Sequence, residues 1–434
     1  MKKSSFGIKD TFVTGFAIFA MFLGAGNLIF PPHIGINAGN MFMTAMLGFL
    51  FTGIAMPMLG VVASAKTGGD MLDFSQIVSK KFGLIFTSLV LICIGPLLAI
   101  PRTGATTYEI GVVPIFGELN WGELWGIPIS RIVVSALYFL LNAILIMRPS
   151  SVVDIIGKYF TPVLLTLLIV LIVKGIVNPI GVPGEPTVAN PFALGFREGY
   201  QTMDALGSFA TAYVAIQSIK SRVKDESEMK KATYMSTIVA AIGLTIVYGG
   251  FVYLGATGSI RFKDIARTDA TIKIVEAIGS NMGKILLAVS MSFACITTSV
   301  GLSTVFVDGF HTISGGKLSK KFLLVFVSVL SFILSVFGVN QIIKLAVPIL
   351  STLYPSGLVL IILNLFRGKI KRSVYRGGVY GALVMGVLYG IEAINPNLAI
   401  IQNFLYKLPL GSSGFAWIIT ALIGIAIGYF INKD

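Results

Sequence analysis

The sequence predicts an all-α polytopic membrane protein, and three observations carry that prediction. Hydrophobic residues fill 55% of the 434 positions and charged residues only 12%, whereas soluble domains have about 25% charged residues. The apolar residues are grouped in blocks that mostly exceed 18 residues, and a helix needs about 20 to cross the hydrocarbon of a bilayer. The blocks are continuously apolar, which favours helices over the short alternating strands of a membrane β-barrel.

Twelve such blocks predict about twelve transmembrane helices. The loops between them reach only about 20 residues, too few for a soluble domain, so residues 1–434 are expected to form a single transmembrane domain. The predicted spans are 11–36, 40–63, 82–110, 130–148, 152–176, 194–219, 229–258, 281–312, 321–338, 341–366, 374–394 and 412–432.

The net charge of +14 follows the loops and does not indicate a nucleic-acid partner. With the N-terminus in the cytoplasm, 22 of the 33 Lys and Arg fall on the inside, 10 on the outside, and Arg102 within a span. Half of the outside group lies in and next to one long loop after the seventh span. Because Lys and Arg accumulate in short cytoplasmic loops, both termini are predicted to be cytoplasmic. The first apolar run lacks a signal-peptide cleavage site and is expected to remain.

Two predicted spans contain helix-breaking residues near their middle. The first contains "FLGAGNLIFPP" (22–32), and the sixth contains "GYQTMDALGSF" (199–209) with the acidic Asp204. Glycine also allows membrane helices to pack closely, so one such segment alone is weak evidence for a broken helix. Their occurrence in both the first and the sixth span, with an acid inside the membrane, indicates broken helices.

These two spans begin two units of five helices each. The units cover 10–177 and 192–366, and two accessory helices follow over 374–432. Because five is odd, the second unit enters the membrane from the opposite side. Interrupted helices at matching positions of inverted halves are typical of the central site of a secondary transporter.

The sequence offers no cluster of groups for catalysis or metal binding. Cys93 and Cys295 lie within spans without a CxxC motif, and His33 and His311 lie near the two membrane surfaces. A nucleophile–base set and a phosphate-binding Walker A motif are also absent, so we expect neither an enzyme, nor a cofactor, nor ATP-driven transport. A channel would need a continuous polar stripe, whereas these spans are polar only at the breaks.

Four segments resemble the branched-chain amino acid cation symporters, which are bacterial carriers of leucine, isoleucine and valine. They are "FLGAGNLIFPP", "IPRTGATTYE", "GYQTMDALGSF" and "SFACITTSVGLSTVFVDGF", and the resemblance extends over essentially the whole chain. It implies the LeuT fold with a five-plus-five inverted repeat. It also implies import of L-leucine, L-isoleucine and L-valine with sodium across the bacterial cell membrane. Membrane lipid is an expected partner, and no obligate protein partner is expected.

An amino acid at the membrane midplane needs partners for its carboxylate and its ammonium group. Opening a helix exposes amide groups at a partially positive N-terminus and frees carbonyl groups, so the unwound backbone supplies both partners. The expected carboxylate donors are the amides of Ala25, Gly26 and Asn27. The expected ammonium acceptors are the carbonyls of Phe22, Thr202, Met203 and Ala205. The preference for a branched side chain rests on the resemblance, because apolar residues are abundant in every span.

The eighth span contains residues that suit a coupling ion. Sodium, like other hard cations, prefers oxygen ligands, and the LeuT fold implies a site between this span and the break in the first. The implied ligands are the carbonyls of Ala20, Leu23 and Ala294 and the hydroxyls of Thr297 and Thr298. The other interpretation is that both threonines bond the carbonyl one turn back. One sodium per cycle is expected, because the seventh span offers no Asn or Asp for a second.

Three ionisable residues within spans leave alternatives open. Asp204 is either the N-cap of the second half of the sixth span or a contact for the substrate or ion. Arg102 and Glu109 are seven residues apart on one helical face, so they either pair with each other or pair across to Asp204. If Asp204 carries a proton, the protein is instead a proton-coupled symporter of the same or another small apolar amino acid.

Overall fold

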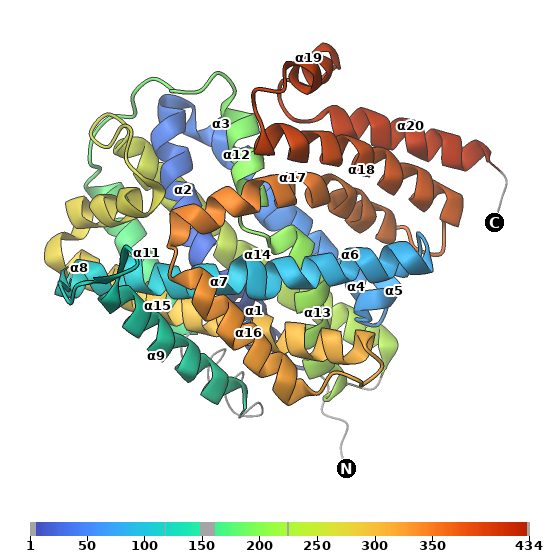
Figure 1. Ribbon diagram of the computed structural model, residues 1–434, viewed down its shortest axis with the longest axis horizontal. Helices are drawn as coiled ribbons and strands as arrows, with labels where there is room; N and C mark the ends of the chain where they lie inside the picture. Colours follow the sequence, from blue (N-terminus) through green and yellow to red (C-terminus); the bar gives the residue numbers. More distant parts are fainter. Residues whose placement is uncertain (1–5, 118, 148–160, 224, 432–434) are drawn as a thin grey trace.

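The protein is a bundle of helices with one short hairpin, seen in a computed structural model that describes residues 6–117, 119–147, 161–223 and 225–431 (Figure 1). Residues 6–117 form α1 (Ile8–Phe22), α2 (Ala25–Ala38), η1 (Gly39–Met41), α3 (Phe42–Leu50), η2 (Phe51–Ala55), α4 (Met56–Ala65), α5 (Met71–Gln76), α6 (Lys80–Ile92), η3 (Cys93–Leu97), α7 (Ala99–Thr106), η4 (Thr107–Val112) and α8 (Val113–Phe116). Residues 119–223 form β1 (Glu123–Leu124), β2 (Ile127–Pro128), α9 (Ile129–Ile146), α11 (Thr161–Val177), α12 (Pro191–Tyr200) and α13 (Asp204–Lys220). Residues 225–431 form α14 (Glu226–Thr257), α15 (Arg267–Ile313), α16 (Lys320–Ser335), α17 (Val339–Asn364), α18 (Arg372–Ile394), α19 (Ala399–Lys407) and α20 (Ala416–Phe430).

Several helices begin at a polar side chain that caps them. Asp70 accepts hydrogen bonds from the amides of the first turn of α5, and Asp225 does the same for α14. Ser79 and Ser319 cap α6 and α16, and Asn190 caps α12. A cap replaces a backbone acceptor that the first turn lacks, so these residues fix where the helices begin at the ends of the bundle.

The predicted breaks in the first and sixth spans are confirmed. The first span consists of α1 and α2, separated by Leu23 and Gly24 in non-helical conformations. The sixth consists of α12 and α13, and Met203 just before α13 has the left-handed φ of 66°. Non-helical backbone in a membrane is tolerated only where protein or a cavity surrounds it, and both breaks lie in the interior of the bundle.

The proline pair of the first span lies inside α2 and does not end it. Pro32 has no amide to donate to the carbonyl of Leu28, one turn earlier. The hydroxyl of Thr271 donates to that carbonyl instead, at 3.3 Å. The helix therefore continues through the prolines, and a neighbouring segment satisfies the carbonyl of Leu28.

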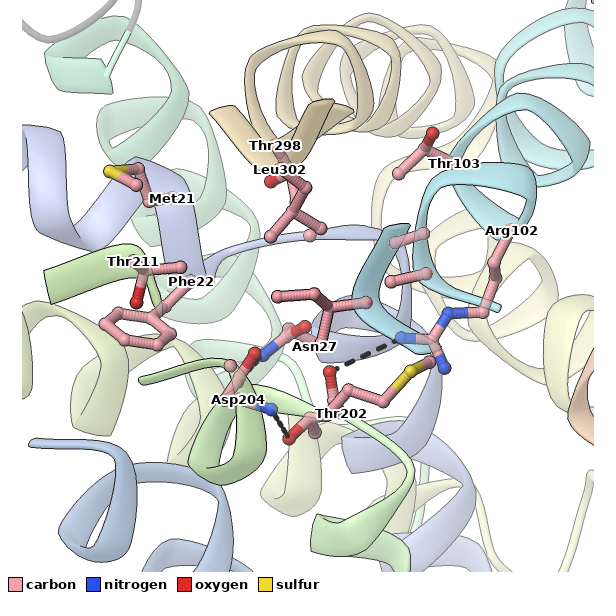
Figure 2. Close-up of a pocket in the computed structure, with 16 residues that line it drawn as sticks. Met21, Phe22, Asn27, Arg102, Thr103, Thr202, Asp204, Thr211, Thr298 and Leu302 are labelled. Carbon is pink, nitrogen blue, oxygen red and sulfur yellow. Dashed lines mark hydrogen bonds between the residues drawn. The ribbon is translucent and has the colours of Figure 1, made fainter. Parts of the chain in front are cut away.

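A third interruption, in the third span, was not predicted. The segment between α6 and α7 is the π-helical η3, in which Gly95 leaves the helical region (φ −87°, ψ −126°). Pro96 follows it and has no amide to donate, so the helix shifts direction there. The break gives α7 an axis of its own, and α7 carries Arg102 toward the centre of the molecule (Figure 2).

The long loop expected after the seventh span is largely helical. α15 begins at Arg267, kinks at Ser280 (φ 53°, ψ −147°) and continues to Ile313. The expectation of a loop here was wrong because the charged residues of 267–279 lie on a helix that packs onto the bundle and buries residues such as Thr271 and Ile274.

By length and composition, seven helices of the described chain can cross a membrane. They are Ala25–Ala65, Lys80–Phe116, Ile129–Ile146, Glu226–Thr257, Arg267–Ile313, Val339–Asn364 and Arg372–Ile394. Other predicted spans are broken, as in the first and sixth, or correspond to shorter helices such as α11 and α20. The first part of the fifth predicted span lies outside the described residues. The total of twelve therefore remains a prediction.

The interior of the bundle is built around the two broken helices. α2 packs against α14 and α15, and α13 packs against α4. The accessory helices α18 and α20 lie beside α17 (orange to red in Figure 1). A Cβ on Gly377 would stand 1.9 Å from the carbonyl oxygen of Gly424, so α18 and α20 approach each other at a contact that requires glycine.

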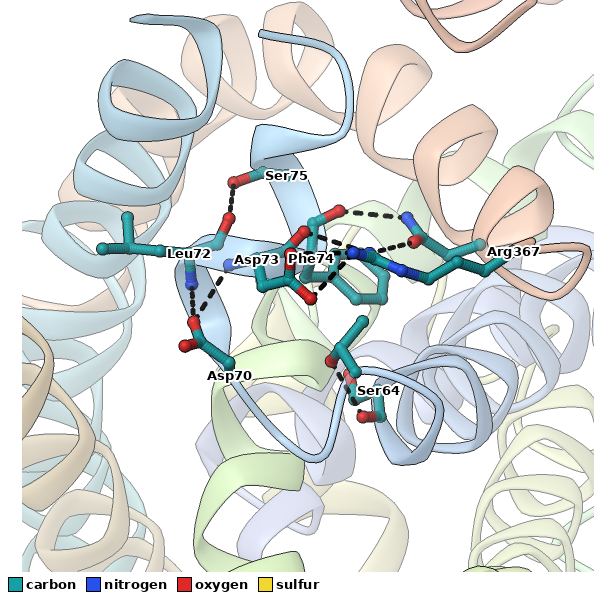
Figure 3. A network of polar contacts seen from close by, with 9 residues as sticks. Ser64, Asp70, Leu72, Asp73, Phe74, Ser75 and Arg367 are labelled. Atoms are coloured by element: carbon teal, nitrogen blue, oxygen red, sulfur yellow. Dashed lines mark hydrogen bonds and ion pairs between the residues drawn. The ribbon is translucent and has the colours of Figure 1, made fainter. Parts of the chain in front are cut away.

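One end of the bundle is held by an ion pair between segments far apart in sequence (Figure 3). The Nη2 of Arg367, just after α17, donates to both carboxylate oxygens of Asp73 in α5, each at 2.7 Å. Its Nη1 donates to the backbone carbonyl of Asp73 at 3.1 Å. The loops after the second and tenth predicted spans therefore lie together.

The N-terminal segment and the loop after the sixth span join the same end. Lys220 donates to the carbonyl of Gly68 at 2.8 Å, in the loop that leads to α5. Arg222 pairs with Asp10 in the first turn of α1 at 3.1 Å. The predicted topology puts all four segments on one side, and these contacts agree with that grouping without saying which side faces the cytoplasm.

Candidate functional site

The two breaks meet at a small cavity of about 30 Å³ in the centre of the bundle (Figure 2). That volume holds a water molecule or two and not an amino acid. Spans one, three, six and eight all contribute to its wall. Six of the eight predicted substrate residues line the cavity, namely Phe22, Ala25, Asn27, Thr202, Met203 and Asp204.

The other two predicted substrate residues, Gly26 and Ala205, lie just behind the wall. Gly26 faces the side chain of Arg102, and a Cβ there would stand 2.6 Å from Nη2. Ala205 is fully buried, and its carbonyl accepts the hydroxyl of Ser208 at 2.7 Å.

The N-terminus of α2 presents free amides to the site. The amide of Asn27 donates to the carbonyl of Gly24 at 3.2 Å, so it closes the first turn. In the described part of the chain, the amides of Ala25 and Gly26 have no hydrogen-bond partner. Two unpaired donors at the partially positive end of a helix form a site that suits a carboxylate.

The carbonyls of the sixth-span break fall into two groups. The carbonyl of Met203 already accepts a hydrogen bond from the amide of Gly207, at 2.9 Å. The carbonyl of Ala205 already accepts one from the hydroxyl of Ser208. Gln201 and Thr202 accept no backbone amide and instead receive the guanidinium of Arg102. In the first span, the carbonyl of Phe22 accepts the amide of Gly24 at 2.8 Å.

Asp204 links the two broken helices and does not cap α13. The N-cap position belongs to Met203, which makes no side-chain cap hydrogen bond. The carboxyl of Asp204 accepts a hydrogen bond from Asn27 Nδ2 at 2.5 Å, and the same amide contacts the hydroxyl of Tyr248 in α14. All three side chains are buried. The N-cap interpretation is therefore wrong, and the group faces the cavity.

Arg102 and Glu109 do not pair with each other. Glu109 lies 3.7 Å from Arg131 of α9 and accepts the amide of Val339 at 3.1 Å. Arg102 turns the other way, into the cavity, and is only 3% exposed. Among the ion pairs of the described chain, none joins Arg102 to Asp204. Arg102 and Glu109 both follow the break at Gly95. The helix that carries them becomes π-helical at Thr107, so the seven-residue spacing of a regular α-helix does not hold between them.

Three of the five predicted sodium ligands lie together, at Thr298. Its hydroxyl lies 3.2 Å from the carbonyl oxygen of Ala20 and 3.3 Å from that of Leu23. In a continuous helix these carbonyls would bond the amides of Gly24 and Asn27, which donate elsewhere. The break therefore frees two oxygens, and the hydroxyl of α15 points at both.

Thr297 makes the contact that the other interpretation requires. Its hydroxyl donates to the carbonyl of Ala294 one turn back, at 3.0 Å. This bond holds the hydroxyl oxygen of Thr297 beside the carbonyl oxygen of Ala294. Thr297 directly precedes Thr298 in the chain. The five oxygens suit a hard cation in kind, since they are carbonyls and hydroxyls.

Several wall residues were missed from sequence. Gly207 and Thr211 line the cavity and follow Asp204 by three and seven positions, so helical spacing alone places them on its face. Thr103 follows Arg102 and lines the cavity with it. Ile94 and Ala99 reach the wall only because the break at Gly95 intervenes, which composition did not reveal.

Over residues 7–434 the chain matches the model of a family described as branched-chain amino acid transport protein. The chain belongs to this family. Two curated relatives from Bacillus subtilis (strain 168) are similar along their whole length. Branched-chain amino acid permease BraB is 38% identical, over 99% of this chain and 97% of its own. Branched-chain amino acid permease BrnQ is 33% identical, over 97% and 96%.

Two solved structures share the fold. One is MHP1, a nucleobase-cation-symport-1 family transporter, in a closed conformation with bromovinylhydantoin bound; the TM-score is 0.57 at 15% identity, over 98% of this chain and 94% of that chain. The other is MhsT in complex with L-phenylalanine, with a TM-score of 0.58 at 16% identity, over 96% and 98%. Both have the LeuT fold, so the predicted fold class is confirmed. At these identities the likeness concerns the fold alone.

Proposed function

We propose that this membrane protein is a secondary active symporter that imports L-leucine, L-isoleucine and L-valine together with sodium by alternating access. The observation that carries the proposal is the meeting of two broken helices at one cavity, with unpaired amides on one side and, on the other, carbonyls that accept no backbone amide. Membership of a branched-chain amino acid transport family supports the substrate class.

The backbone groups suit the head of an amino acid. The amides of Ala25 and Gly26 are donors for the carboxylate, and the carbonyls of Gln201 and Thr202 are acceptors for the ammonium group. The rest of the wall includes apolar side chains such as Ile94, which suit an aliphatic tail. A charged tail would be buried without a partner at a cost of several kcal/mol.

Sodium coupling is supported by Thr298 and the two carbonyls that the first break frees. Occupation of that site would fix the unwound residues Leu23 and Gly24 of the first span. The unpaired amides of α2 begin at the next residue, Ala25. The ion would thereby order the carboxylate site, which is the physical basis of coupling that we propose.

A proton-coupled carrier is the second candidate, and Asp204 is the observation that favours it. The carboxyl is buried between two broken helices and bonds to Asn27. Protonation would change the hydrogen bonding of both helices at once, which is what a coupling ion must do.

The orientation is also a proposal. The N-terminal segment shares one end of the bundle with the loops after spans two, six and ten, through pairs such as Arg222 with Asp10. These segments include the densest groups of Lys and Arg, so we assign that end to the cytoplasm of the bacterial cell.

Uptake competition tests the proposed substrate class. Excess unlabelled leucine, isoleucine and valine should each suppress uptake of labelled leucine into cells that express the protein. Lysine and glutamate should not, because either would bury an unpaired charge. Strong inhibition by lysine would contradict the proposed pocket.

A sodium titration at two pH values separates the coupling ions. We expect leucine binding that rises with sodium at both pH values, in the wild type and in Asp204→Asn. Binding that follows pH and ignores sodium in the wild type, and loses its pH dependence in Asp204→Asn, would establish the proton carrier instead.

A further inference from the structure

Arg102 occupies the part of the site where the head of the substrate belongs. From α7 its side chain reaches between the two breaks (Figure 2). Nη1 donates to the carbonyl of Gln201 at 2.6 Å, and Nη2 to that of Thr202 at 3.5 Å. The guanidinium also lies over the ring of Phe30, 5.4 Å from its centroid. A buried cation thus lines a site that is proposed for a zwitterion.

The two carbonyls are the acceptors that the sixth-span break leaves for an ammonium group. Those of Met203 and Ala205 already have donors within α13. Those of Gln201 and Thr202 receive only the guanidinium in the described chain. Guanidinium and ammonium are both cations that donate hydrogen bonds, so they compete for the same oxygens.

The opposite face of the guanidinium lies against the first span. A Cβ on Gly26 would stand 2.6 Å from Nη2 and 2.8 Å from Cζ, so a side chain there would displace the guanidinium. The amide of Gly26, a proposed carboxylate donor, therefore belongs to the residue that the guanidinium touches. A carboxylate bound there would meet the fork of Arg102 and could form a charge-assisted pair.

We infer that Arg102 determines the specificity of the site for ligands that carry both charges. Without substrate, the guanidinium holds the carbonyls of Gln201 and Thr202 and lines the cavity. A substrate must replace it there with an ammonium group, and must offer it a carboxylate in exchange. This inference rests on the proposed function, because it names how the same site distinguishes an amino acid from an amine.

A ligand with one charge makes only half of that exchange. An amine displaces Arg102 from the two carbonyls and offers the guanidinium no carboxylate in exchange. A carboxylate pairs with Arg102 but leaves the two carbonyls unbonded. Removal of the arginine cancels the first penalty and not the second, because the carbonyls and the nearby carboxyl of Asp204 remain.

Three ligands test the inference on the purified full-length protein at one saturating sodium concentration. They are leucine, 3-methylbutylamine, which is leucine without its carboxylate, and 4-methylpentanoate, which is leucine without its ammonium group. Calorimetry of the wild type, Arg102→Gln, Arg102→Lys and the control Arg131→Gln gives their affinities. Arg131 pairs with Glu109 away from the cavity, so it controls for loss of a positive charge.

In Arg102→Gln we expect leucine to bind at least about tenfold more weakly, since a charge-assisted hydrogen bond is lost. We expect 3-methylbutylamine to bind at least about tenfold more tightly than it binds the wild type, and 4-methylpentanoate to remain unbound. Arg102→Lys should weaken leucine and still reject the amine. Arg131→Gln should leave the ratio of leucine to amine affinity unchanged.

An unchanged ratio in Arg102→Gln would overturn the inference. So would a gain for both single-charge ligands, which would show only an enlarged cavity. If Arg102→Gln does not fold, Arg102→Lys decides, and acceptance of the amine by that variant would overturn the inference. Failure of the proposed function is a separate result, because it shows in the wild type as absence of leucine binding.

Discussion

Thr298 lies where the eighth span meets the break in the first span. Its hydroxyl approaches the carbonyls of Ala20 and Leu23 at 3.2 and 3.3 Å. A hydroxyl has one proton and cannot bond both carbonyls fully, so part of their demand for a positive charge stays unmet. A sodium ion among these oxygens would meet it, which makes Thr298 the residue with most bearing on coupling.

Thr298→Ala should lower the apparent affinity for sodium by about tenfold or more, because a ligand to a charged group contributes about 1.5–3 kcal/mol. Leucine binding should weaken at moderate sodium and recover at high sodium, since binding of ion and substrate is reciprocal. Thr298→Ser keeps the oxygen and should be milder. Sodium titrations of leucine binding measure this.

The matched control is Thr304→Ala on the same helix. Thr304 bonds the carbonyl of Val300 one turn back and does not line the cavity. A shift of sodium affinity in the control equal to that in Thr298→Ala would refute a specific role for Thr298.

The sequence predicted functional residues well where their side-chain type is rare in apolar spans. It predicted them poorly where the role depends on the direction in which the side chain points. Asp204 and Thr298 stood out because ionisable and paired hydroxyl groups are scarce in apolar spans, and both line the cavity. Arg102 stood out as well, but its partner could not be predicted. The helix that carries Arg102 becomes π-helical at Thr107, before Glu109, so a spacing of seven residues does not place the two side chains on one face.

At the scale of elements, the sixth-span break depends on the backbone of Met203. A φ of 66° is unfavourable for a residue with a side chain, most of all for a β-branched one. The buried Met203 side chain nevertheless lines the cavity, so glycine would lose a wall contact. The strain is located at the hinge between α12 and α13.

Met203→Ile should destabilise the protein by about 1–3 kcal/mol relative to Met203→Leu. The two replacements have similar volumes, and they differ in the branch at Cβ that the left-handed backbone disfavours. Thermal unfolding in detergent gives the comparison, with labelled-leucine uptake as a second readout. Equal stabilities would mean that Met203 is not left-handed in the protein.

The glycine-rich breaks were predictable as elements, whereas the third-span break and the start of α15 were not. Two glycine-rich segments at matching positions of a repeat support each other as evidence for broken helices. The Gly95–Pro96 pair has no such counterpart, so it did not indicate a break by itself. α15 begins at Arg267 among charged residues that read as a loop, yet the segment buries residues such as Thr271 against the bundle. Tertiary packing outweighed local composition there.

For the whole molecule, the contacts at one end of the bundle include an exposed ion pair. The pair of Arg222 with Asp10 joins the N-terminal helix to the end of α13, and both side chains are more than a third exposed. The alternating access that we propose requires such contacts to break and reform. An exposed pair contributes only about 0–1 kcal/mol, which suits a contact that must open in every cycle.

Arg222→Gln and Asp10→Asn should each shift the population toward opening at this end by at most about fivefold. A single cysteine at Met21, which lines the cavity, should react faster with an impermeant maleimide in inside-out vesicles. Lys230→Gln is the control, because its partner Glu226 is on the same helix. An Arg222→Asp, Asp10→Arg double variant that stays as reactive as the single variants would contradict the pair's role.

Gradient-driven uptake into proteoliposomes tests the central claim, that the broken helices couple an amino acid to sodium. Labelled leucine is presented with an inward sodium gradient, with equal sodium on both sides, or with an inward proton gradient and no sodium. We expect accumulation above equilibrium only with the sodium gradient. Accumulation driven by the proton gradient without sodium would contradict it and make Asp204 the coupling group.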